Sequence, residues 1–504
     1  MEPWTRRIIE QMELEFEKQG LKDLKPLLRE VQAQEQTQEL RLTEGMPDLG
    51  RVLGAWGQVI LRGKEWRSDA VSFSGGVMAY VLYAPEDGSE LRTLESWIPF
   101  QMKWDLDDNH REGEIRIQCL LRFLDARSVS PRKIMLRCGV SALAEAFRED
   151  AAMLSVPGEV PEDVQLLKNR YPLRLRKKAG EKTFQLDELL PFAGGGKIVS
   201  CTMTPRISEC RLLSGRLVFR GSGMVHAVCL TGDGRVESRE LEVPISQFEQ
   251  LEGEYSPDAQ ADVRMAVTSL EAEPVEGDQL RLKAGLVAQY TVDDREMVEI
   301  VEDAYSPRRQ LEPVREELEV HNILEQRQAN VPVRQTIRQN ARDIADVTYL
   351  PDFPSAHRGE GVQMELPGQF QVLYYDENGI LQSSTARTEE NWDMPLGENA
   401  RVDATVLPGP PATAAAGSGI ELKGESVLNL TTTARRGIPM VTELKLGEEK
   451  QLPEVRPSLI LRRAGDAGLW EIAKSTGSTV EAIRLANGLD TEPESSRILL
   501  IPVS

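Results

Sequence analysis

Histidine and cysteine, the residues most often used for metal binding and nucleophilic catalysis, are scarce in this 504-residue chain. The histidines are His110, His226, His321 and His357, and they show neither HExxH nor His-x3–5-His spacing, so no metal site is predicted. The cysteines show no CxxC spacing, and buried, reduced thiols are expected at Cys119, Cys138, Cys201, Cys210 and Cys229.

The segment Gly194-Gly195-Gly196-Lys197 looks superficially like a phosphate-binding loop. Such a loop needs glycine where Pro191 stands and serine or threonine where Ile198 stands, so the phosphate-loop interpretation fails. The glycines are expected instead to form a turn that leads into a strand at Ile198 and Val199.

Acidic pairs are common in the chain, for example Asp107-Asp108 and Glu389-Glu390. In so acidic a sequence they are expected to be solvated loop residues rather than glycosidase carboxylates. No GxSxG nucleophile elbow is present. The sequence therefore predicts a protein that is not an enzyme, with no catalytic residue, no metal and no cofactor.

The formal net charge is −21 at pH 7. An acidic chain is a poor ligand for nucleic acid or for an anionic membrane surface, but it suits partners that carry basic patches. No apolar run reaches the roughly 18 residues of a membrane span. Acidic residues interrupt the N-terminal MEPWTRRIIEQMELEFEKQ before any apolar signal region could form. A cytoplasmic site of action is expected.

An internal repeat of about 145 residues organises most of the chain. Three similar segments end at Gly88, Gly234 and Gly379, at separations of 146 and 145 residues. Each is a run of β-branched or aromatic residues followed by Asp-Gly or Asn-Gly, the dipeptides of tight hairpin turns. His226 falls where the other repeats have Tyr80 and Gln371, so a structural strand position is expected for it.

These patterns predict a mainly β protein with three tandem antiparallel modules, each a sandwich or barrel. The predicted boundaries are 36–150 for module 1, 151–305 for module 2 with its lead-in, and 306–452 for module 3 with its lead-in. Residues 1–35 are predicted to form an amphipathic helical segment, because Ile9, Met12 and Phe16 share one helical face. The stretch 408–419, PGPPATAAAGSG, is interpreted as a flexible surface loop.

Four of the seven tryptophans lie in module 1, at positions 56, 66, 97 and 104. Aromatic side chains of this kind occur both in small β cores and at protein interfaces, and the sequence leaves both roles open.

Residues 455–504 form a separate C-terminal domain with the predicted order strand, helix, helix, strand. Asp466 is expected to cap a helix that buries Leu469, Ile472 and Ala473, and Gly477 is expected to end it. Residues 478–481 read as a capping box for a second helix, which ends at Asn487-Gly488. Trp470 lies about 100° from the buried direction, so it either packs at the edge of the core or stands free as a partner anchor.

This domain resembles the LysM family in GD at 465–466, LWEIA at 469–473, AN at 486–487 and LLIP at 499–502. In that family, the loop after the first strand and the loop before the second bind N-acetylglucosamine polymers. The family usually has GDTLW, whereas this chain has GDAGLW, which places the additional Gly468 in the glycan-facing loop. The resemblance implies a partner- or glycan-binding site at Asp466, Leu469, Trp470, Asn487 and Leu489.

Three β modules followed by a LysM domain also resemble the SPOCS-domain proteins of endospore-forming bacteria, in particular the SipL-like spore coat morphogenesis proteins. That resemblance implies a non-enzymatic adaptor in the mother-cell cytoplasm, recruited to the forespore surface and the spore coat. Its LysM domain would bind the coat-scaffold ATPase stage IV sporulation protein A, and other coat proteins are possible partners. The alternative is a protein that binds peptidoglycan or N-acetylglucosamine polymers through the LysM domain.

Overall fold

The computed structural model describes residues 12–107, 112–194, 196–213, 215–359, 361–397, 399–416, 419–450 and 457–503. Within these ranges the chain is mainly β, with antiparallel sheets and two short helices near the C-terminus, so the predicted fold class is confirmed at this level. No helix of the described residues is long and apolar enough to cross a membrane.

Six successive strands form the first unit, which consists of two three-stranded sheets. The first strand pairs with the last and the last with the fifth, while the second, third and fourth form a separate meander. In chain order the strands are β2 (Glu17–Arg41), β3 (Leu49–Arg67), β4 (Ala70–Pro85), β5 (Arg92–Asp105), β6 (Glu114–Ser130) and β7 (Lys133–Val156).

The same strand order and pairing recur in units two and three. Unit two contains β8 (Gln165–Pro191), β9 (Lys197–Leu213), β10 (Arg216–Leu230), β11 (Val236–Gln250), β12 (Gln260–Val275) and β13 (Gln279–Tyr305). In unit three the second and fifth strands are each split in two, giving β14 (Arg309–Ile337), β15 (Asp343–Pro351), β16 (Ser355–Arg358), β17 (Val362–Tyr375), β18 (Leu381–Met394), β19 (Ala400–Pro408), β20 (Ala412–Ala416) and β21 (Gly419–Glu449).

The repeat glycines occupy the same turn in every unit, between the third and fourth strands. Gly88, Gly234 and Gly379 have φ of 71°, 82° and 75°, and the amide of each donates to the carbonyl three residues earlier. A residue with a Cβ is strained in this left-handed conformation, which explains the Asp-Gly and Asn-Gly pairs. The predicted turns are confirmed.

The predicted N-terminal helix is wrong. Residues 1–11 lie outside the described part of the chain, but β1 (Met12–Glu15) and β2 are strands. β2 pairs with β7 from Glu17 to Arg41, so the segment is the first strand of unit one rather than a separate element. The lead-ins of the other units likewise contain the first strands β8 and β14. The apolar stripe that favoured a helix is short, and pairing with a distant strand outweighs it.

The predicted loop at 408–419 is also largely strand, because β20 continues along β21 from Ala412 to Ala416. Its prolines separate β19 from β20 instead of forming a free loop. Proline has no amide hydrogen to donate to a sheet, which accounts for the break.

Equivalent residues of the three units meet in the interior. Leu82, Val228 and Leu373 stand at the same repeat position, are at most 2% exposed and belong to one core cluster. The same cluster holds Leu53 with Val199 and Val236 with Leu381, which are again repeat equivalents or near-equivalents. We call this cluster the apolar layer.

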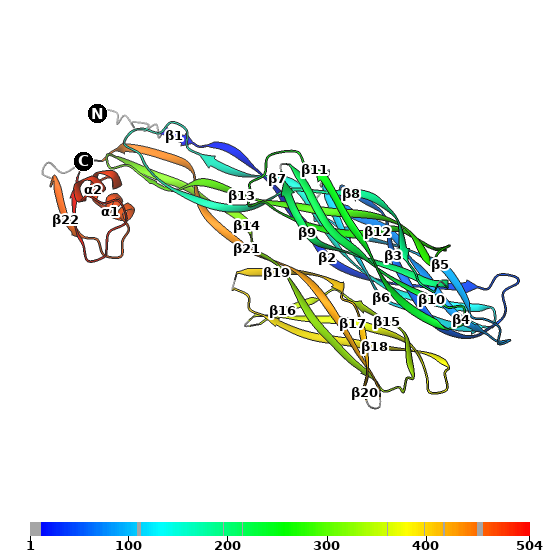
Figure 1. Ribbon diagram of the computed structural model, residues 1–504. Coiled ribbons are helices and arrows are strands. Elements are labelled where there is room, and N and C mark those ends of the chain that lie inside the picture. Colours follow the sequence, from blue (N-terminus) through cyan, green and yellow to red (C-terminus); the bar gives the residue numbers. More distant parts are fainter. Residues whose placement is uncertain are drawn as a thin grey trace, which may run out of the picture.

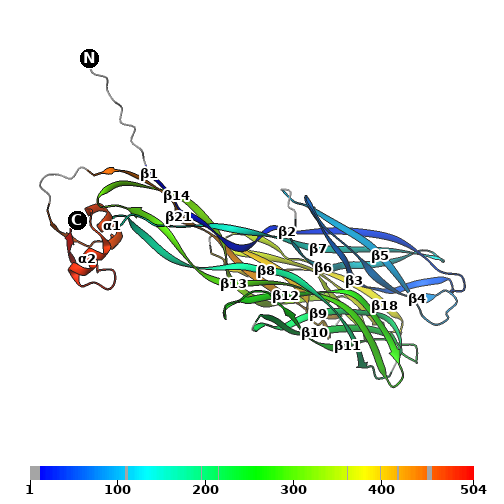
Figure 2. The same ribbon diagram turned by 90° about the horizontal axis from the view of Figure 1, so that it is seen from above.

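The first and last strands of all three units extend beyond the sandwiches as a tapering stem (Figures 1 and 2). Its core again combines the units, with Leu21 and Leu154 from the first, Leu173 and Ile300 from the second, and Leu318 and Ile438 from the third. Strand β1 pairs with β21 of unit three, which joins the start of the chain to the end of the last unit. The C-terminal domain sits at the narrow end of the stem (Figure 1).

The tryptophans of unit one serve mainly as core residues, and two of them pack between units. Trp104 is 1% exposed and stacks on Phe73 inside unit one. Trp97 packs against the core of unit two. The indole Nε1 of Trp56 donates to Asp346 of unit three over 2.7 Å. Two of these tryptophans therefore lie at an interface, but it is an interface between units of the same chain.

Candidate partner-binding site

The C-terminal domain consists of β22 (Leu459–Arg463), α1 (Leu469–Thr476), α2 (Val480–Asn487) and β23 (Ile498–Pro502). The two strands pair antiparallel, α2 packs on β23 and α1 packs on α2. The core residues of the domain are at most 2% exposed, and they are Ala464, Leu469, Ile472, Ala473, Ile483, Leu499 and Ile501; Tyr305 of the stem belongs to the same cluster. Gly477 and Gly488 end the helices with φ of 65° and 58°, as glycine in the C-cap position allows.

The helix starts differ from the sequence prediction. The N-cap of α1 is Gly468, which has no side-chain cap, so Asp466 does not cap this helix. The inserted Gly468 moves the helix start away from Asp466, and the carboxylate of Glu492 accepts from the Leu469 amide at 2.9 Å instead. For α2 the cap is Thr479 rather than Ser478, since its side chain accepts from the Ala482 amide.

Trp470 packs at the edge of the domain core, one of the two positions that the sequence left open, and there it also meets the stem. Its ring meets that of Tyr305, the last residue of β13, edge to face with centroids 4.8 Å apart. The Tyr305 hydroxyl in turn donates to the carbonyl of Ser478 over 2.9 Å. Trp470 and Tyr305 therefore help to fix the C-terminal domain to the stem.

Asp303 is the polar centre of this junction. Its carboxylate accepts from the Trp470 indole at 2.8 Å and from Lys474 at 2.7 Å, and it also pairs with Arg315 of β14. Partial burial raises the pKa of Asp303, but the hydrogen bonds from Lys474 and Trp470 outweigh this and lower the pKa below its usual value. An ionised, hydrogen-bonded carboxylate between stem and domain makes the contact directional as well as apolar.

The other four candidate residues have mainly structural positions. Leu469 is fully buried, and Leu489 packs against the same core. The Asn487 side chain joins α2 to β23, donating to the Ile483 and Leu500 carbonyls and accepting from the Leu500 amide at 2.8 Å. Asp466 is exposed, and Ser495 donates to it at 3.3 Å.

The two loops that would face a glycan are hydrogen-bonded to each other. The Gly465 amide donates to the Ser495 carbonyl at 2.9 Å. The bonds from Leu469 to Glu492 and from Ser495 to Asp466 also join these loops. Several polar groups that could contact a sugar are therefore already engaged within the domain.

The sequence analysis missed an apolar patch on the outer face of the C-terminal sheet. Leu459, Leu461, Ile498 and Leu500 are 49%, 67%, 63% and 38% exposed. In the register, Leu461 lies opposite Leu500, and Ile498 is two residues along the same strand. We call these four residues the outer-sheet patch. The signal was present in the sequence: both strands are apolar at successive positions, but a two-stranded sheet with helices on one side can bury only alternate residues.

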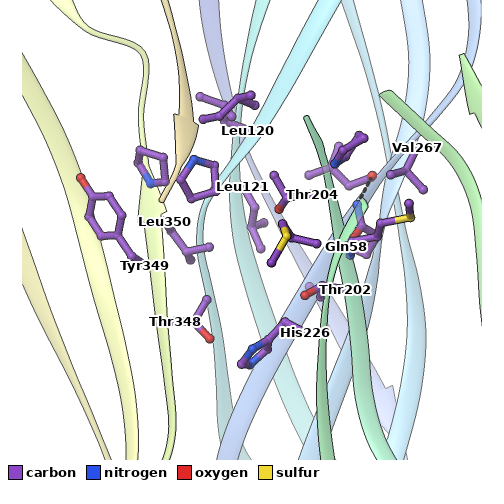
Figure 3. A pocket seen from close by; sticks show the side chains of 18 of the residues that line it. Gln58, Leu120, Leu121, Thr202, Thr204, His226, Val267, Thr348, Tyr349 and Leu350 are labelled. Carbon is purple, nitrogen blue, oxygen red and sulfur yellow. Dashed lines mark hydrogen bonds between the residues drawn. The ribbon is translucent and has the colours of Figure 1, made fainter. Parts of the chain in front are cut away.

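A second candidate region is a cavity of about 210 Å³ where the three units meet (Figure 3). His226, Thr202 and Thr348 point into it beside Leu121 and Leu350, so strands of all three units contribute (Figure 3). Gln58 at its wall accepts from the Met203 amide at 2.7 Å. The lining is largely engaged in contacts between units, and its volume is below the 300–1,000 Å³ usual for ligand pockets.

His226 joins two units through two carboxylates. Its Nδ1 lies 2.6 Å from Glu240 on the neighbouring strand, and its Nε2 lies 2.8 Å from Asp346 of unit three. Burial lowers the pKa of His226, but the charge of Asp346 and hydrogen bonds to both acids outweigh it and raise the pKa to about 10. A histidine held protonated in this way is a poor general base, and the expected structural role agrees with this geometry.

The five thiols are free, with Cys138, Cys201 and Cys229 buried and Cys119 and Cys210 partly so. Burial raises the pKa of each thiol, to about 11 for Cys138 and about 12 for Cys201 and Cys210. Such thiols are weak nucleophiles. Over the parts of the chain that the structure describes, no group of three or more His, Cys, Asp or Glu residues is placed to hold a metal ion.

Comparison with known proteins does not identify a relative: no family model, no curated protein and no solved structure matches the chain.

Proposed function

We propose that this chain is a non-enzymatic protein–protein adaptor that presents its C-terminal domain to a partner at the tip of the stem. The observation that carries the proposal is the outer-sheet patch, whose four aliphatic side chains lie together on a domain that is otherwise fixed to the body by Trp470. Contiguous exposed apolar side chains on a folded domain mark interaction sites.

The partner suggested by the sequence resemblance is the coat-scaffold ATPase stage IV sporulation protein A, bound in the mother cell at the forespore surface. In this proposal the three units form a rigid body and the LysM-like domain supplies the contact. The glycan-binding alternative gains less support, because the loops it needs are hydrogen-bonded to each other and Trp470 faces Tyr305.

The test is binding of purified full-length chain to stage IV sporulation protein A, measured by biolayer interferometry. Leu461→Glu places a charge at the most exposed residue of the outer-sheet patch. Truncation or disruption of an interface anchor costs about 2 kcal/mol, so we expect an affinity loss of about thirtyfold. Leu485→Glu is the matched control, because Leu485 is 85% exposed on α2 and lies outside the patch.

Trp470→Ala gives a second comparison. It removes the ring contact with Tyr305 but leaves the seven buried core residues of the domain in place, so we expect the domain to stay folded and to keep its partner. Equal binding by the wild type and Leu461→Glu would refute the patch as the binding surface. Binding of N-acetylglucosamine oligomers by the full-length chain, with none of the protein partner, would favour the alternative function.

A further inference from the structure

A larger cavity, of about 850 Å³, is lined mainly by the first and fifth strands of all three units and by the last strands of units one and three. Nine basic and five acidic side chains line it, which is a local positive surplus in a chain whose net charge is −21. It is separate from the C-terminal domain and from the cavity around His226, since its lining shares no residue with either.

The floor of this cavity is a buried ionic network that we call the charged layer. Glu145 of unit one pairs with Arg116 at 2.7 Å, with Arg264 of unit two at 2.8 Å and with Arg29 at 3.3 Å. Asp262 of unit two pairs with Arg116 at 2.7 Å and with Arg264 at 3.0 Å. The charges of the floor are therefore largely balanced.

The excess of positive charge comes from arginines that line the cavity outside this network. Among the described residues, Arg174, Arg358 and Arg435 line the cavity without a carboxylate within ion-pair distance. Of these, Arg358 donates to the carbonyl of Gly397 at 3.2 Å. On the acidic side, Glu319 also lacks an ion pair, and Asp23 accepts from the Arg176 amide at 3.0 Å. In the described part of the chain, three guanidinium groups without an ion pair thus line the space, against two carboxylates without one, Glu319 and Asp23.

Arg264, in the floor of the cavity, also has a hydrogen-bond donor without a partner among the described residues. Its Nε is buried and donates to no described residue, although both of its terminal nitrogens are paired. Burial and then the nearby charge of Arg116 lower the pKa of Arg264 below its usual value, against the pull of Glu145 and Asp262. An additional negative charge in the cavity would offset the repulsion between these arginines.

We propose that this cavity binds a small polyanion that carries two or more phosphate or carboxylate groups. Guanidinium groups match the geometry of both oxyanions through paired hydrogen bonds, and their weak hydration favours such contacts at partly buried sites. The volume falls in the range of 300–1,000 Å³ that is usual for small-molecule sites. Because all three units contribute to the lining, an occupant would also tie the units together.

The experiment measures binding of inorganic pyrophosphate and of citrate to the full-length chain by isothermal titration calorimetry, at constant ionic strength set with sodium chloride. We expect one site per chain and a ligand-dependent rise in melting temperature. The double variant Arg174→Gln, Arg435→Gln should weaken binding at least about tenfold, since it removes two charge-assisted contacts. Stronger binding of pyrophosphate than of citrate assigns phosphate as the natural group, and the reverse order assigns carboxylate.

The control is Arg334→Gln, Arg338→Gln, which removes two exposed arginines outside the cavity and changes the net charge equally. Without ligand, the cavity variant should melt no lower than the wild type, because it removes like charges that have no carboxylate partner. The proposal is overturned if neither anion binds more tightly than chloride, or if the two double variants lose affinity to the same extent.

Discussion

The apolar layer and the charged layer lie along the same assembly of three units but use repeat positions in opposite ways. In the apolar layer, Leu82, Val228 and Leu373 are equivalent and chemically alike. In the charged layer, Arg116 of unit one stands at the position of Asp262 of unit two, 146 residues later, and the two pair at 2.7 Å. Equivalent positions therefore hold the same kind of residue in the apolar layer, whereas the equivalent pair Arg116 and Asp262 in the charged layer has opposite charges.

This difference shows what is gained by joining three units in one chain. Identical subunits around a threefold axis must place the same side chain at each equivalent position, so a charged residue there would face its own copies. Within a single chain the three copies can diverge, and Arg116 can meet Asp262. The apolar layer needs no such divergence, because hydrophobic packing depends on volume and not on charge.

The strongest test of the charged layer is Glu145→Gln. Glu145 is 5% exposed and is the shared partner of three arginines, so its neutralisation leaves buried positive charges uncompensated. We expect a loss of about 4 kcal/mol in the free energy of unfolding, as is typical when one member of a buried ion network is removed. Urea denaturation followed by tryptophan fluorescence measures it.

Glu149→Gln on the same strand is the control for that substitution. Glu149 pairs with Lys22 at 3.1 Å, but both side chains are more than half exposed. A surface pair of this kind contributes about 0–1 kcal/mol. Equal unfolding free energies for the two variants would show that the charged layer does not stabilise the assembly.

The apolar layer should respond less strongly, through packing alone. Leu82→Ala removes a fully buried side chain from the contact between units, and we expect a loss of about 3 kcal/mol from lost burial and the cavity left behind. Differential scanning calorimetry would report a lower melting temperature. Leu213→Ala, at a residue 54% exposed, should leave it nearly unchanged. A Leu82→Ala protein that melts like the Leu213→Ala protein would contradict the assignment of this layer as core.

The sequence predicted the features that depend on local chemistry. The Asp-Gly and Asn-Gly pairs located the turns at Gly88, Gly234 and Gly379, because positive φ restricts the residue choice at each one. The apolar spacing of Leu469, Ile472 and Ala473 located the buried face of α1 in the same way. Both signals involve residues that are close together in the chain.

Features that depend on contacts between residues far apart in the chain could not be predicted from local sequence patterns. β2 is polar for much of its length, and it is a strand because β7 pairs with it, with Glu17 opposite Val156. Trp470 was ambiguous because its neighbour is Tyr305, 165 residues earlier. The charged layer likewise brings together Arg29, Glu145 and Arg264, which no spacing rule connects.

His226 gives the smallest expected effect, and it tests whether a single ionic contact can act inside the apolar layer. It stands at the repeat position of Tyr80, which belongs to that layer, yet it lies between Asp346 and Glu240. In the folded protein the pKa of His226 is raised to about 10, well above the value of about 6.5 for a histidine in an unfolded chain. Below pH 6.5 both states are protonated, so the stabilisation is complete. As the pH rises toward 10, the unfolded state releases the proton first and the stabilisation is lost, by at most about 1.4 kcal/mol per pH unit.

We therefore expect the wild type to lose at least about 1 kcal/mol relative to His226→Gln between pH 6.5 and 8.5, measured by urea denaturation at each pH. Thiols and tyrosines titrate alike in both proteins, so the difference between the two curves isolates His226. Parallel curves would mean that protonation of His226 adds nothing to the stability of the folded protein, and that the hydrogen bond from Trp56 to Asp346 joins the units without help from that charge.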